Sequence, residues 1–88
     1  MANFMGGSAP AMANQVAEGF ILLSANSLKG FSPGDLNLLR TELDKLAREA
    51  RSEVPPPDDA LANQSRNRRI GRLNSAMQFV SHKLTARA

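Results

Sequence analysis

The sequence predicts an all-α fold: a helical hairpin with heptad seams, as a three-helix up-down-up bundle or as part of a larger coiled-coil-like assembly. Two stretches of the chain repeat apolar residues at alternating spacings of three and four, which is the helical period. A triple proline separates the two stretches, and no stretch alternates apolar and polar residues as a strand would. The 88 residues allow one domain, which we expect at residues 8–88.

The first predicted helix spans residues 9–28 and follows a flexible tail at residues 1–7, which has two glycines and no period. Ser8 is a suitable N-cap, and Pro10 is tolerated in the first helical turn. The apolar residues of this helix spread over more than one face: Met12, Val16, Phe20, Ile21, Leu22 and Leu23. We therefore expect other parts of the structure to cover it on more than one side.

The second predicted helix spans residues 33–53 and has a well-marked start. Ser32 can act as the N-cap, Pro33 suits the first helical position, and Asp35 stands where a capping-box carboxylate would. The seam of this helix consists of Leu36, Leu39, Leu43, Leu46 and Ala50.

The third predicted helix spans residues 59–86 and begins after the connector at residues 54–57. The prolines of the connector stop the second helix, and Asp58 or Asp59 can cap the third. The seam of the third helix repeats the same spacing at Ile70, Leu73, Met77, Val80 and Leu84.

A short connector between two seams predicts that the helices pair antiparallel. Counting outward from the prolines sets Leu46 opposite Arg66, and the charges on the flanks predict an ion pair between Glu42 and Arg69. Because Arg66 is a poor partner for a leucine, Leu43 and Leu46 need apolar residues from another helix to pack over them. We favour the first helix for this role over a helix from another molecule.

These patterns predict a small non-enzymatic helical subunit that binds proteins, either itself or a larger complex. The expected apolar partner-binding residues are Leu39, Leu43, Leu46, Ile70, Leu73, Met77, Val80 and Leu84. The alternative is nucleic-acid binding by the third helix, because the chain from residue 58 onward carries six basic and two acidic residues. This basic face, which could equally contact a protein, consists of Arg66, Arg68, Arg69, Arg72, Phe79 and Lys83.

A second face of the third helix is polar and uncharged. One hypothesis is that its side chains form hydrogen bonds across helices, while Gly71 allows close approach of a partner; the other is a solvated, partly frayed helix start. The polar residues concerned are Asn63, Asn67, Asn74 and Gln78.

The composition argues against most chemistry. The chain has no Cys and one His, so we expect no metal site, no cofactor, no small-molecule substrate and no enzymatic activity. The longest apolar run is residues 20–23, and a membrane span needs roughly 20 such residues. The first basic residue is Lys29, so a secretory leader is not expected. We expect an intracellular, cytoplasmic protein, with the nucleus left open and a membrane surface as the least favoured partner.

Overall fold

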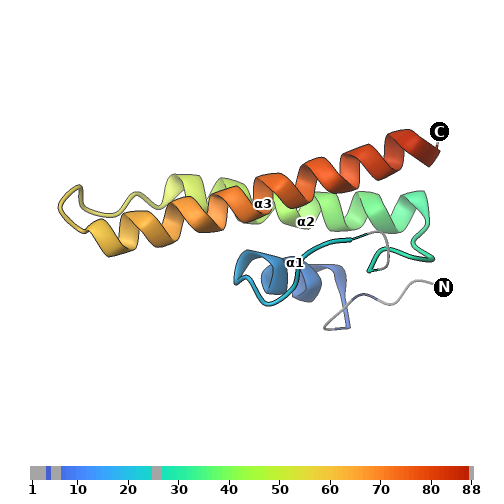
Figure 1. Cartoon of the computed structure of the whole chain (residues 1–88), viewed down its shortest axis with the longest axis horizontal. Helices are drawn as coiled ribbons and strands as arrows, with labels where there is room; N and C mark the ends of the chain where they lie inside the picture. Colours follow the sequence, from blue (N-terminus) through green and yellow to red (C-terminus); the bar gives the residue numbers. More distant parts are fainter. Residues whose placement is uncertain (1–3, 5–6, 25–26, 88) are drawn as a thin grey trace.

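Two long helices and one short helix make up the fold. The computed structural model describes residues 4, 7–24 and 27–87, and within them it has three helices and no strand, which confirms the all-α prediction. Helices α2 (Pro33–Ser52) and α3 (Ala60–Arg87) form a long antiparallel hairpin, and α1 (Ala9–Ala17) lies against one side of it (Figure 1). All three helices contact one another, as expected for a helical bundle.

The first helix is much shorter than the predicted span of residues 9–28. It ends at Ala17 because Gly19 adopts a φ of +82°, which L side chains rarely adopt. The Gly19 N–H donates to the Val16 carbonyl (3.1 Å) and the Phe20 N–H donates to the Gln15 carbonyl (2.9 Å). These two bonds form a Schellman motif, the usual end of a helix that stops at glycine. Residues 20–24 after it are irregular, and we call them the strap.

The starts of the two long helices follow the predicted capping. The Asp35 N–H donates to Ser32 Oγ (3.1 Å) and the Ser32 N–H donates to Asp35 Oδ2 (3.0 Å), so the capping box is complete. Of the two candidate caps for α3, Asp59 accepts a hydrogen bond from the Ala62 N–H through Oδ1 (3.0 Å). The ends of α2 and α3 lie within one residue of the predicted bounds.

The core lies where α1 covers the hairpin. Leu39 and Leu43 of α2 and Leu73 of α3 are fully buried in one cluster with Met12 and Val16 of α1. Each fully buried leucine contributes about 1.5–3 kcal/mol relative to an exposed one. The burial of Leu43 in this cluster agrees with the predicted cover by the first helix, whereas Leu46, which was expected to share that cover, is only half-buried.

The α1–α2 connection closes the other end of the core. Leu28 and Phe31 from this connection are buried together with Val80 of α3. Phe4 packs edge-on against Phe31, with ring centroids 5.1 Å apart. Of the predicted flexible tail at residues 1–7, Phe4 and Gly7 are described, and the remainder lies outside the described residues.

Candidate functional site

Arg66 of α3 caps the C-terminus of α2. Its Nε donates to the Ala50 carbonyl and its Nη2 donates to the Arg51 carbonyl, both at 2.9 Å. The last carbonyls of a helix have no partner within it, and the prolines at residues 55–57 have no N–H with which to supply one. Arg66, predicted to lie opposite Leu46, thus sends its guanidinium to the end of α2.

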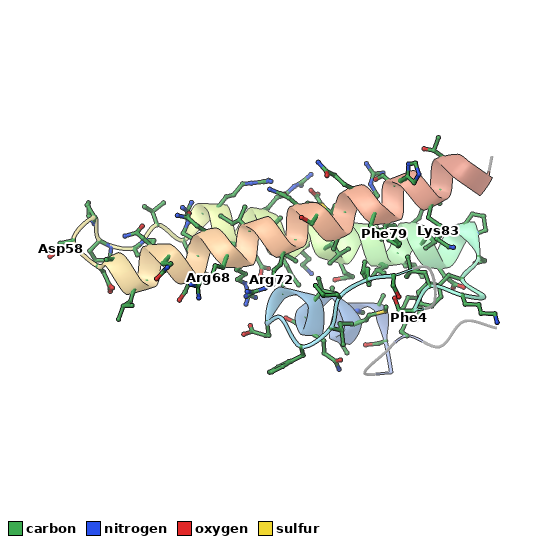
Figure 2. All side chains as sticks on the ribbon, viewed as in Figure 1. Phe4, Asp58, Arg68, Arg72, Phe79 and Lys83 are labelled. Atoms are coloured by element: carbon green, nitrogen blue, oxygen red, sulfur yellow. The ribbon has the colours of Figure 1, made fainter. Side chains whose placement is uncertain are left out.

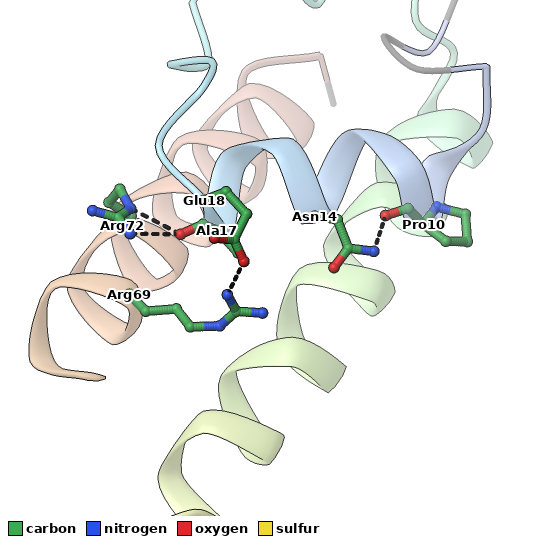
Figure 3. Close-up of polar contacts among 6 residues, drawn as sticks. All are labelled: Pro10, Asn14, Ala17, Glu18, Arg69 and Arg72. Carbon is green, nitrogen blue, oxygen red and sulfur yellow. Dashed lines mark hydrogen bonds and ion pairs between the residues drawn. The ribbon is translucent and has the colours of Figure 1, made fainter. Parts of the chain in front are cut away.

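Arg72, six residues further along α3, caps the C-terminus of α1 in the same way. Its Nε and Nη2 both donate to the Ala17 carbonyl, at 2.9 and 2.7 Å (Figure 3). Backbone N–H groups of residues 18–20 satisfy the three preceding carbonyls of α1, at residues 14–16. Arg72 therefore completes the set, and its positive charge complements the negative end of the helix dipole.

Arg69 forms its ion pair with Glu18, and the predicted pairing with Glu42 is wrong. The reason is the early end of α1, which brings Glu18 alongside α3 (Figure 3). The side chains of Arg69 and Glu18 are 31% and 53% exposed. A pair this exposed contributes about 0–1 kcal/mol to stability.

Three arginines of the predicted basic face thus form contacts within the chain: Arg66, Arg69 and Arg72. Arg68 is exposed, and no carboxylate of the described residues lies within 4.0 Å of it. Lys83 and Phe79 are half-buried, and Phe79 packs against the core. Figure 2 shows Arg68 and Arg72 close to α1, whereas Phe79 and Lys83 lie nearer the C-terminal end of α3.

A groove lies between the strap and α3, with a volume of about 470 Å³. The strap contributes Leu22 and Leu23, and α3 contributes Phe79 together with Arg68 and Arg72. None of the residues lining it is acidic. Its apolar character and its two guanidinium groups make this groove the candidate functional site.

Two strap side chains are unusually exposed for their size. Leu22 is 82% exposed and Phe20 is 78% exposed. In the predicted helix these side chains lie on different apolar faces, which we expected other parts of the structure to cover. The irregular strap instead leaves them in solvent, and of the two only Leu22 lines the groove. The signal that could have revealed this is Gly19, a glycine placed where a helix can end.

Gly71 forms an open part of the groove wall. It lies in the interior of α3, and a Cβ atom built on it would have no neighbour within 4 Å. Glycine in a helix interior costs up to about 1 kcal/mol relative to alanine. Because nothing within the described chain packs over this position, the glycine leaves space at the groove.

Half of the predicted apolar partner residues lie fully inside the chain. Leu39, Leu43, Leu73 and Val80 are fully buried, so in this conformation they contact the chain's own elements and have no surface for a partner. The other four are half-buried: Leu46, Ile70, Met77 and Leu84. For these four, a role in partner binding stays a prediction.

The polar face of α3 makes one hydrogen bond between the long helices. Arg51 Nη2 of α2 donates to Asn74 Oδ1 at 3.0 Å. Asn63 Nδ2 donates locally to the carbonyls of Pro56 and Asp59, both at 2.9 Å. Asn74 thus acts across helices as the first hypothesis stated, whereas Asn63 supports the start of its own helix.

Comparisons of the chain with protein families, with curated proteins and with solved structures found no match. Over residues 4, 7–24 and 27–87, no three His, Asp or Glu side chains are grouped so that they could hold a metal ion. None of the described helices combines the length and the apolar character needed to cross a bilayer.

Proposed function

We propose that the chain is a small non-enzymatic helical protein that acts by binding another protein, and that the strap and the groove form its contact surface. The exposure of Leu22 in the wall of an apolar groove, with Phe20 also exposed on the same strap, carries this proposal. Burying apolar surface is favourable by about 25 cal/mol per Å², so a partner that covers these side chains gains that free energy on binding. A composition with one His and no Cys also favours binding over catalysis.

The proposed surface replaces the leucine seams as the main site of contact. The fully buried seam leucines are available only if the hairpin opens. The strap side chains need no such opening, since they are already in solvent. Binding through the strap therefore leaves the core intact.

Nucleic-acid binding by α3 has less support. Arg66 and Arg69 of the predicted basic face are held by intrachain partners, and affinity for nucleic acid depends on several cations that are free to contact phosphates. Phe79 packs partly against the core, so only part of its ring is available to stack on a base. Photo-cross-linking distinguishes nucleic-acid binding from protein binding.

Site-specific photo-cross-linking in the cells that produce the protein tests the proposal. A photoreactive amino acid replaces Leu22, and a matched variant carries it at Leu38, an α2 residue that is 57% exposed and does not line the groove. We expect discrete protein adducts from position 22 and far fewer from position 38.

The composition of the adducts decides between the alternatives. An adduct of twice the chain's mass identifies a second copy as the partner, and a different mass identifies another protein. Adducts that nuclease removes, or equal yields from positions 22 and 38, would contradict the proposal. Light scattering after size exclusion at low and high salt then reports whether the free chain self-associates.

A further inference from the structure

We infer that the partner presents an acidic amphipathic helix, which docks in the groove between the strap and α3; this inference rests on the proposed function. Three features of the groove support it: its charge, its apolar lining and the open space at Gly71.

The charge on the lining of the groove is positive, and the two arginines that carry it also border a neighbouring hollow that contains Glu18, Glu49 and Glu53. Arg68 and Arg72 line the groove, and no acidic residue does. The partner of Arg72 is the neutral Ala17 carbonyl, so its guanidinium charge persists. The carboxylate of Glu18 is engaged by Arg69. A partner with carboxylates along its flank complements this charge and is selected over a basic one.

The shape of the groove suits a helix. The α3 residues that line it run from Arg68 to Phe79, a rise of about 17 Å, which matches about three helical turns. Leu22 and Leu23 on one side and Phe79 on the other offer contacts to an apolar stripe. Gly71 and Ser75, one turn apart, carry little or no side chain, so a partner helix can approach α3 closely.

A lipid surface and a nucleic acid fit less well. The phosphates of a nucleic acid could pair with Arg68 and Arg72, but they would not use the apolar lining that the strap and Phe79 provide. The surface of an anionic bilayer could take up the exposed Leu22, but it does not fill a groove or the space at Gly71. An apolar groove with a charged rim is the arrangement that binds amphipathic helices.

The test uses the full chain and two synthetic peptides of about 16 residues. The acidic peptide carries leucines at helical spacing and glutamates beside them, and its basic twin has lysines in place of the glutamates. Fluorescence anisotropy measures affinity, and amide chemical shifts locate the binding site. We expect the acidic peptide to bind at least about tenfold more tightly than the basic one and to shift the amides of residues 20–24 and 68–79.

Two variants test charge and close approach. Arg68→Glu should weaken the acidic peptide about tenfold and strengthen the basic one, whereas Arg40→Glu, an equal charge change on an exposed α2 residue outside the groove, should change neither by more than about twofold. Gly71→Gln should weaken the acidic peptide about tenfold while raising the melting temperature by about 3 °C, because glutamine favours helix. Lost binding in this variant therefore does not reflect unfolding.

A third variant tests the strap. Leu22→Ser should weaken the acidic peptide about fivefold, and the matched Leu38→Ser should leave it unchanged. The inference is overturned by equal binding of the two peptides, by no binding of the acidic peptide, or by amide shifts outside the groove. It is also overturned if anionic vesicles or RNA shift the groove amides and the acidic peptide does not. Protein cross-links from position 22 without acidic-peptide binding would overturn the inference alone and leave the proposed function standing.

Discussion

Replacing Arg72 by alanine should destabilise the protein by about 2 kcal/mol, because Arg72 supplies the donors that complete the C-terminus of α1. Its two charge-assisted hydrogen bonds reach one carbonyl, that of Ala17, and the side chain is half-buried. Hydrogen bonds to charged groups contribute about 1.5–3 kcal/mol, and a cation at a partly buried helix C-terminus contributes up to about 2. Because both donors share one acceptor, we expect a single contribution of this size, not the sum.

Two further variants separate the hydrogen bonds from the charge. Arg72→Lys keeps the charge but has no planar pair of donors, so it should cost about 1 kcal/mol. Arg68→Ala removes an exposed arginine without a carboxylate partner among the described residues, and it should stay within about 0.5 kcal/mol of the parent.

Urea denaturation followed by circular dichroism measures these differences. With a slope of about 1 kcal/mol per M for a chain of this size, a loss of 2 kcal/mol lowers the midpoint by about 2 M. Hydrogen exchange should show the largest acceleration in α1, whose end Arg72 caps. Equal midpoints for Arg72→Ala and Arg68→Ala would refute the capping role, and so would unchanged exchange in α1.

Three other substitutions test the remaining contacts. Gly19→Ala should cost about 1–2 kcal/mol because the φ of +82° disfavours a Cβ, and thermal melts would show it; an unchanged melting temperature would contradict the Schellman end of α1. Arg66→Ala should cost about 1–2 kcal/mol and accelerate exchange at the end of α2, since it leaves two carbonyls without donors; parent-like exchange there would count against the cap. A double-mutant cycle between Glu18 and Arg69 should give a coupling below about 1 kcal/mol that salt reduces, and a cycle between Glu42 and Arg69 should give none.

The elements that could be predicted are those governed by local chemistry. Ser32 and Asp35 mark the start of α2 because a capping box needs only residues that are near in sequence. The prolines mark its end because each lacks an N–H. The helical spacing of the apolar residues then identifies a core that includes Leu43 and Leu73.

The candidate site could be predicted less well. The exposure of Phe20 and Leu22 depends on where α1 ends, and an apolar period that continues past Gly19 favoured a longer helix. The spacing of apolar residues shows which residues can be buried together. Whether a glycine continues a helix or ends it depends on the contacts around that glycine. Here the Arg72 side chain lies beside Gly19, 3.5 Å from the position of a Cβ.

By itself, the sequence determined the helical class, the two long helices and most of the seam that becomes the core, because these depend on backbone chemistry and on burial of apolar side chains. The tertiary structure alone decided what the arginines of α3 do. Arg66 and Arg72 donate to main-chain carbonyls, and Arg69 pairs with an acid 51 positions away in the sequence. Every residue carries a carbonyl, so no side-chain pattern identifies which ones need a partner until the ends of the helices are brought together in space.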